Sequence, residues 1–229
     1  MLYLKPNWPA PTQIKAFTTT RSGWSRNVHE PHNQVNQSLE KLLDLPSSPL
    51  WLKQEHTAIA LEAIPQHVEK IGDASFTKQH NHVCIVETAD CLPILICNKQ
   101  ASMVAAIHAG WRGLSNHIIE TTLDAIQQSP NDLLVWLGPA IGPQHFEVGE
   151  DVYDAFTSSH PHSSIAFTPH HPGKWLANLY LLARMRLQAR GVNQIYGGEY
   201  CTHTQADLFF SYRRDKGITG RMASVIWIA

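Results

Sequence analysis

Short apolar runs rich in β-branched residues recur along the chain. Each run is too short for a helix, and this length and composition are typical of buried strands. The pattern predicts strands over Ile14–Thr19, Val83–Val86 with Leu92–Cys97, Met103–Ile107, Leu133–Leu137, Ile195–Gly198, Phe209–Tyr212 and Val225–Ile228. Asp90 and Cys91 interrupt the run from Val83 to Cys97, and His108 closes the next run. A cysteine inside one strand and a histidine at the end of the next can meet across neighbouring strands.

Apolar residues recur at helical spacing in two longer stretches, residues 114–128 and 174–190. This spacing gathers them on one face of an amphipathic helix. Ser115 is a suitable N-cap for the first helix, and Gly191 is a suitable residue just after the second. Shorter helices are predicted over Ser38–Leu43 and residues 150–157, and loops over Gly138–Pro143 and His160–Gly173.

The composition suits a globular protein with a substantial core. The chain has 229 residues, of which 43% are hydrophobic and 16% charged, and neither a linker nor an internal repeat divides it. The mixture of strands and helices predicts one α/β domain over residues 1–229, of the α+β kind with mixed sheets and flanking helices.

The net charge and the spacing of the cysteines bear on which partners and which cellular location to expect. The net charge of −1 gives no basic footprint, so no nucleic-acid partner is expected. The N-terminus carries prolines where a signal peptide needs an apolar segment, and no run approaches membrane-spanning length. The four cysteines lack CxxC spacing, which favours reduced thiols and a cytoplasmic location.

Three residues stand out as candidates for chemistry. With 14 histidines in the chain a single histidine is weak evidence, but His56 and His108 each follow a short apolar run closely. Cys84 and Cys97 fit the ordinary role of a small buried hydrophobic residue. Cys91 fits that role less well, because Asp90 and Pro93 beside it break the alternation of the strand.

Together, His56, Cys91 and His108 offer two imidazoles and one thiolate. This set suits a zinc ion whose fourth position stays open, as in catalytic zinc sites. The same residues also suit a cysteine nucleophile with a histidine base. The long sequence spacing does not distinguish the two.

Several arginines lie beside glycine-containing or aromatic turns, and for each of them surface charge is the ordinary interpretation. A phosphate-using enzyme would nevertheless need such a planar donor close to the metal. These arginines are Arg21, Arg112, Arg213 and Arg214.

Four blocks of the sequence resemble a known family. They read TADCLPILICN, AAIHAGWRGL, WLGPAIGPQHFEVG and FFSYRRDKGITGRMASVIW, and the chain from about Trp8 to its C-terminus is similar to the YfiH family, also called the laccase-domain or multicopper polyphenol oxidase family. The resemblance implies that His56, Cys91 and His108 bind zinc and act in catalysis. It also implies an α/β fold like that of cytotoxic necrotizing factor catalytic domains.

The resemblance implies a cytoplasmic enzyme acting on purine nucleosides. The activities associated with the family are phosphorolysis of adenosine, inosine and S-methyl-5′-thioadenosine to free base and sugar 1-phosphate, together with adenosine deamination. The expected partners are therefore a small-molecule nucleoside and phosphate, with Arg21 as the candidate phosphate ligand. A monomer or small homo-oligomer is expected, with no nucleic acid and no membrane.

Three other functions are alternatives within the same family resemblance. A copper-dependent polyphenol oxidase would need several copper ions, whereas the trio offers one site and the matched blocks lack dense His–x–His pairs. A hydrolase editing peptidoglycan precursors would use Cys91 as nucleophile and His108 as base. A descendant that only binds metal is the third alternative.

The chain departs from the family pattern at three places. Thr57 replaces the glycine of the usual QVHG motif, and Asn178 stands where an aspartate is common. Residues 24–49 are shortened and rewritten. That segment is expected to contribute to the pocket in relatives, so it bears on substrate choice.

Overall fold

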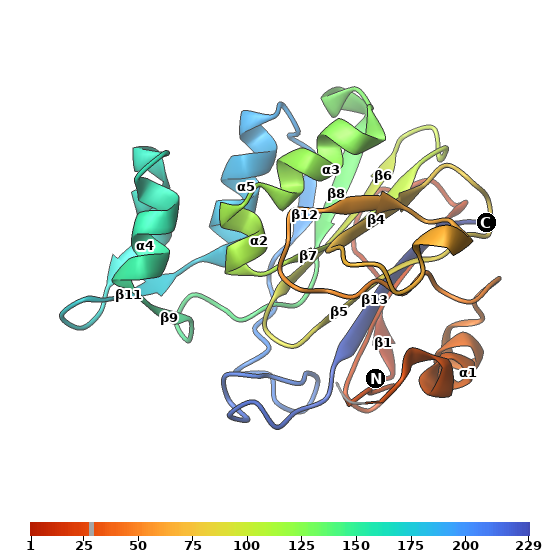
Figure 1. The fold of residues 1–229 in the computed structure, drawn as a ribbon, viewed down its shortest axis with the longest axis horizontal. Coiled ribbons are helices and arrows are strands. Elements are labelled where there is room, and N and C mark those ends of the chain that lie inside the picture. Colours follow the sequence, from red (N-terminus) through yellow and green to blue (C-terminus); the bar gives the residue numbers. More distant parts are fainter. Residues whose placement is uncertain (28–29) are drawn as a thin grey trace.

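Two β-sheets packed face to face organise the structure, a computed structural model that describes residues 1–27 and 30–229 (Figure 1). The larger sheet has the strand order β12 (Ile195–Gly197), β8 (Leu133–Leu137), β6 (Leu92–Asn98), β7 (Val104–Ala109), β4 (Ala74–Thr77) and β3 (Ala60–Glu62). The smaller sheet has the order β1 (Tyr3–Leu4), β2 (Ile14–Thr19), β13 (Met222–Ile228) and β5 (Cys84–Thr88). A third sheet comprises β10 (Phe167–Pro169), β11 (Lys174–Ala177) and β9 (Glu147–Gly149).

The alternation of side chains along β6 shows how the layers are held together. Ile94 and Ile96 are fully buried against the helices, in the cluster that contains the apolar faces of α3 (Ile118–Ile126) and α5 (Leu179–Ala189). Leu95 points the other way, into a cluster shared with the smaller sheet. Because both faces of the strand are covered, it is apolar throughout rather than alternating.

Helices cover the two outer faces of this sandwich. The α3 and α5 helices lie on the larger sheet, and α1 (His32–Leu43) packs Leu39 and Leu43 against the outer face of the smaller sheet (Figure 1). The α4 helix (Glu150–Thr157) sits beside the third sheet. Short 3-10 helices span Pro65–His67, Pro130–Asp132 and Pro161–Ala166.

The chain changes sheets between β5 and β6. The expectation that Val83–Val86 and Leu92–Cys97 form one interrupted strand was wrong, because β5 belongs to the smaller sheet and β6 to the larger. Cys91 therefore lies just before β6 rather than inside a strand. Asp90 makes the bend with a φ of 90°, a left-handed conformation that aspartate tolerates better than most residues.

The predicted helix over residues 114–128 is two helices. The α2 helix (Trp111–Ser115) ends before Asn116, and α3 begins after His117, whose φ of 69° breaks the helical path. Ser115 is therefore not an N-cap, and its hydroxyl instead donates to the Arg112 carbonyl at 3.0 Å.

Two other predictions needed correction near the C-terminus. Residues 174–190 divide into β11 and α5, with Asn178 as the N-cap that accepts a hydrogen bond from the Leu181 amide at 3.0 Å. Gly191 follows the helix with a φ of 80°, as expected. Phe209–Tyr212 is not a strand, because Phe209 is buried with Leu4 and Met222 beneath a series of turns.

The predicted mixed α/β architecture, with several sheets and flanking helices, is confirmed. In the part of the chain that the structure describes, no helix is both long and apolar enough to cross a bilayer.

Candidate metal centre and its cavity

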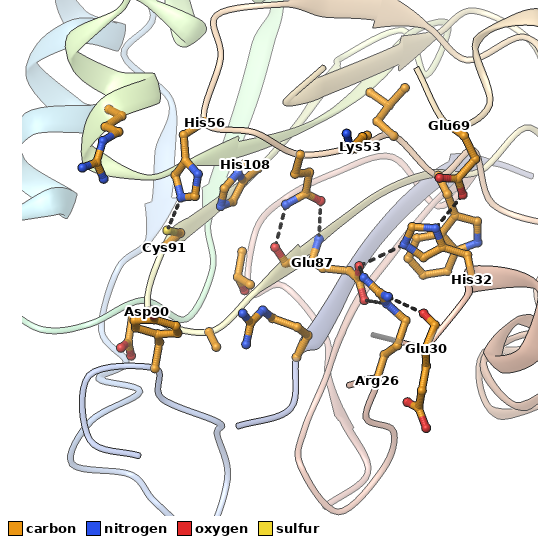
Figure 2. Close-up of a pocket in the computed structure, with 18 of the residues that line it drawn as sticks. Arg26, Glu30, His32, Lys53, His56, Glu69, Glu87, Asp90, Cys91 and His108 are labelled. Atoms are coloured by element: carbon orange, nitrogen blue, oxygen red, sulfur yellow. Dashed lines mark hydrogen bonds and ion pairs between the residues drawn. The ribbon is translucent and has the colours of Figure 1, made fainter. Parts of the chain in front are cut away.

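The three sequence candidates His56, Cys91 and His108 come together at one point (Figure 2). The Cys91 Sγ lies 3.7 Å from the His56 Nε2, and one donor atom from each of the three residues lies within 4.8 Å of the others. The two imidazole rings have centroids 4.8 Å apart and meet edge to face. His108 is buried, whereas His56 and Cys91 are partly exposed.

Strand pairing explains how residues far apart in sequence meet here. In the β6–β7 pair, Leu92 lies opposite Ala109 and Pro93 opposite His108. Cys91, one residue before β6, is therefore beside the end of β7. His56 comes from the loop before β3 and has a φ of 60°, which turns the chain towards the other two residues.

Gly110 leaves the space in which these side chains approach each other. A Cβ atom at this position would lie 2.9 Å from the Cys91 Sγ and 2.9 Å from the His56 Cδ2. Real Cβ atoms essentially never approach other atoms so closely, so the geometry of the site requires a glycine at position 110, the first of the two glycines in the HAGWRG block.

Asp73 fixes both histidines, and sequence reasoning missed it. Its fully buried carboxylate accepts a hydrogen bond from the His108 Nδ1 at 2.7 Å. It also accepts bonds from the backbone amides of His56 at 3.1 Å and Thr57 at 2.5 Å. Because a carboxylate only accepts, the Nδ1 of His108 carries a hydrogen and its Nε2 is left to bind a cation. The only signal in the sequence was an acidic residue at the entrance of a buried strand.

In the metal-free protein, charges inside the cluster favour a Cys91 thiolate beside a protonated His108, whose Nε2 must lose its proton when a cation binds. Burial by itself would raise the pKa of the Cys91 thiol, but the charge and hydrogen bonding of His108 and a hydrogen bond from His56 lower it to about 6. Burial would lower the pKa of His108, but the Cys91 thiolate and the Asp73 carboxylate raise it to about 9. Cys91 is therefore a thiolate at neutral pH, the form that both metal binding and nucleophilic attack require.

Hydrogen bonds of Asp90 stabilise the bend that places Cys91 in the cluster. Its carboxylate accepts hydrogen bonds from the Thr202 hydroxyl at 2.6 Å and the Arg213 backbone amide at 2.7 Å. Its carbonyl accepts a bond from the Ile141 amide at 3.0 Å. The bend is thus tied to three segments that are distant in sequence.

The cluster opens into a cavity of about 1130 Å³. Part of the opposite wall comes from the rewritten segment, since Arg26 and His32 line the cavity together with Glu87 and Trp51. Arg26 makes a two-pronged ion pair with the buried Glu87, at 2.6 and 2.5 Å. His32 lies between Glu69 and Glu87 and stacks on Trp51 at 4.3 Å.

This ion network keeps Glu87 charged inside the protein. Burial would raise the pKa of Glu87, but hydrogen bonds from His32 and Arg26 and their positive charges lower it. Gln54 adds a side-chain bond to each of the Glu87 backbone groups, both at 2.8 Å. The rewritten segment therefore closes this side of the cavity with Arg26 and His32, whose side chains are hydrogen-bonded.

The arginines predicted from sequence divide into two groups. Arg112 and Arg213 line the cavity, as does Arg221. The other two lie elsewhere: Arg214 pairs with Asp215 at 2.8 Å, and Arg21 donates to the Ala206 carbonyl at 2.7 Å. Arg21 is thus not brought to the candidate site.

The three cavity arginines differ from Arg26 in their charge balance. Among the described residues, no carboxylate lies within ion-pair distance of Arg112, Arg213 or Arg221. Arg221 is partly buried, and this burial lowers its pKa. Unpaired guanidinium groups at a cavity are suited to binding an anion.

The donor set fits a zinc ion. Two imidazole nitrogens and one thiolate are ligands that zinc prefers, and three protein ligands leave a fourth position for water or substrate. The carboxylate partner behind His108 is the usual second partner of a zinc-bound histidine. By contrast, Cys84 is fully buried and burial raises its pKa to about 12, which agrees with a role in the core.

Comparison of the sequence with known proteins shows the family of this chain. The family model for "Multi-copper polyphenol oxidoreductase laccase" matches residues 16–229. The chain belongs to this family. The purine nucleoside phosphorylase YfiH of Escherichia coli is a relative with 43% identity, covering 97% of each chain. The purine nucleoside phosphorylase of Haemophilus influenzae is 42% identical and covers 99% of each chain.

Solved structures of relatives share the architecture. A Neisseria meningitidis protein of family DUF152 superposes with a TM-score of 0.93 and 40% identity, covering 100% of this chain and 99% of its own. YlmD from Geobacillus stearothermophilus gives a TM-score of 0.89 at 27% identity, covering 100% of this chain and 96% of its own. The resemblance to the YfiH family noted from the sequence blocks is thereby confirmed.

Proposed function

We propose that the protein is a zinc-dependent purine nucleoside phosphorylase. The names of its relatives support this class of reaction. The observation that carries the proposal is that one cavity holds both the His56–Cys91–His108 cluster and three arginines without a carboxylate partner among the described residues. We further propose that residues 1–229 act as one catalytic domain and that the enzyme works in the cytoplasm, where its free cysteines stay reduced.

The cluster is proposed to be catalytic as well as metal-binding. A zinc ion held by His56, Cys91 and His108 would supply a Lewis acid for the oxygens of the reactants. Asp73 keeps the His108 ring in the orientation and tautomer that this role requires. Gly110 keeps the two more accessible ligands at their close separation.

Phosphate is proposed to bind at the cavity arginines rather than at Arg21. Phosphorolysis forms a bond between a phosphate oxygen and the anomeric carbon of ribose and breaks the bond from that carbon to the base. The phosphate needs positive charge and planar donors beside the sugar, which Arg112, Arg213 and Arg221 can supply. Arg21 is engaged with Ala206 and lies over the Phe210 ring.

The proposed substrates are adenosine, inosine and S-methyl-5′-thioadenosine, with deamination of adenosine as a second activity. A cavity of about 1130 Å³ has room for a nucleoside and phosphate together. Deamination requires only water as the second reactant, so the same cluster could serve both reactions.

One observation favours a second candidate, a Cys–His hydrolase. The low pKa of Cys91, the protonated His108 and the orienting Asp73 match the arrangement of a cysteine nucleophile, its histidine partner and a third orienting group. In that reaction Cys91 would attack a carbonyl carbon directly, and no metal would be needed.

Product analysis with adenosine separates these functions. Metal-analysed protein is incubated with adenosine, with and without phosphate, and the products are resolved by chromatography. We expect adenine and ribose 1-phosphate only when phosphate is present, and inosine, the product of deamination, in either case. Absence of adenine at saturating phosphate would contradict the phosphorylase proposal and favour the hydrolase.

A further inference from the structure

A second group of metal-ligating side chains lies on the third sheet, apart from the cavity cluster. It consists of Glu147 at the start of β9 and of His170 and His171 in the turn between β10 and β11. One donor atom from each of the three lies within 4.8 Å of the others. Glu147 is partly exposed and the two histidines are exposed.

Backbone pairing holds the three residues in place. The turn is closed by hydrogen bonds from the His170 amide to the Lys174 carbonyl at 3.0 Å and from the Lys174 amide to the His171 carbonyl at 2.8 Å. In the same sheet, Glu147 lies opposite Leu176 of β11. Strand β9 and the short turn between β10 and β11 therefore carry the donors.

The contacts among the side chains point to a shared cation. The His170 Nε2 lies 3.6 Å from a Glu147 carboxylate oxygen, and the rings of His170 and His171 have centroids 4.0 Å apart. An ion pair between His170 and Glu147 would leave His171 unexplained. A single divalent ion at this point would be within reach of one donor atom from each of the three residues.

We propose that Glu147, His170 and His171 form a second metal site, which takes a zinc-class transition ion. Two imidazoles and one carboxylate suit zinc, nickel or copper(II) and disfavour magnesium and calcium, which prefer oxygen ligands alone. Exposed ligands leave the remaining coordination positions to water. The assignment of this site does not rest on the proposed catalytic function.

An ion here would act on the rim of the cavity. The Glu147 carbonyl accepts a hydrogen bond from the Arg213 guanidinium at 2.8 Å. Arg213 also lies over the ring of Phe146 at 5.4 Å, and both residues line the cavity. Fixing the Glu147 side chain would therefore help to fix the strand end on which Arg213 rests.

The test is a zinc titration of tag-free protein whose first site is already loaded with zinc. Isothermal calorimetry is carried out on the wild type, on the His170→Asn/His171→Asn double variant and on a matched His160→Asn/His162→Asn control, which removes two other exposed histidines. We expect the wild type and the control to bind one further zinc ion each. Loss of an outer-sphere partner alone weakens metal sites by roughly 10–100-fold, so loss of two ligands should abolish the second binding event.

Two outcomes would overturn the proposal. In one, the wild type takes up no zinc beyond the first ion. In the other, the His170/His171 variant binds the additional ion as tightly as the control. Circular dichroism of the variants checks that they are folded, which the exposure of the substituted residues leads us to expect. Glu147→Gln, which keeps the shape of the side chain, provides a second variant that should weaken the same binding event.

Discussion

At the residue scale, Gly110 makes the most specific demand on the site. Its φ of −70° is one that alanine adopts without strain, so Gly110→Ala should perturb only through the added methyl group. That group would press on the Cys91 sulfur and the His56 ring, both at 2.9 Å. We expect Gly110→Ala to fold but to lose most of its bound metal and at least about 90% of its activity, a loss comparable to that caused by removing a residue that orients a metal ligand.

Gly113 provides the matched control three residues further on. A Cβ atom there would make ordinary contacts of 3.4 to 3.5 Å with Ile118, His108 and Thr57. Gly113→Ala lies in α2 and should stabilise it by up to about 1 kcal/mol, since alanine is the better helix former. Equal metal content and turnover in the two variants would show that the close approach at Gly110 does not matter.

The ionisation of Cys91 predicts how the thiol reacts with iodoacetamide. In metal-stripped protein the labelling rate should rise with pH through about 6, the lowered pKa of this thiol, and level off above it as the thiolate becomes fully formed. Peptide mass mapping follows the reaction, with Cys84 as an internal control that stays unlabelled because burial raises its pKa to about 12.

Metal binding should reverse that reactivity. A thiolate bound to zinc is protected, so labelling of Cys91 in the zinc-loaded protein should be slow at every pH. Fast labelling that ignores chelation, with activity lost in parallel, would contradict the zinc assignment and support the hydrolase.

At this scale the sequence singled out three residues that the fold brings together, but not the residue that orients them. His56, Cys91 and His108 were distinguished by their places after or within apolar runs. Asp73 was missed because its partners are the His108 ring and the amides of residues 55–57, contacts that exist only after the sheets have formed. Arg21 was predicted as a phosphate ligand because it lies in a turn, but it does not line the cavity and donates to the Ala206 carbonyl instead.

At the element scale, Asn178 shows that a departure from the family pattern can be neutral. As the N-cap of α5 it accepts the Leu181 amide at 3.0 Å, and aspartate can make the same bond. Asn178→Ala should lower the free energy of unfolding by about 1 kcal/mol, whereas Asn178→Asp should leave it unchanged or raise it slightly through the helix dipole. Urea unfolding measures both variants, and an alanine variant as stable as the wild type would refute the capping role.

Elements with one clear pattern were predicted closely. The strands Ile14–Thr19 and Leu133–Leu137 and the helix at residues 150–157 agree with the structure. The errors arose where tertiary contacts override local pattern. His117 breaks one apolar helix into two, and the aromatic residues at Phe209 pack beneath turns instead of forming a strand.

At the scale of the whole molecule, the cavity depends on segments that the sequence separates widely. The change of sheet at Asp90 and Cys91 cannot be read from the sequence pattern, because β5 before it and β6 after it are both buried throughout. The rewritten segment was expected to bear on the pocket, and the structure places Arg26 and His32 in its wall, held by Glu87. Such pairing between residues 61 positions apart is not visible in a single sequence.

The most direct test of the account is to measure activity against zinc content. The protein is stripped with a chelator and titrated with zinc, and the release of hypoxanthine from inosine is measured at saturating phosphate after each addition. We predict that turnover is absent in the stripped protein, rises in proportion to the first zinc ion bound per chain, and is not restored in Cys91→Ala. Full phosphate-dependent turnover in the metal-free protein would contradict the account.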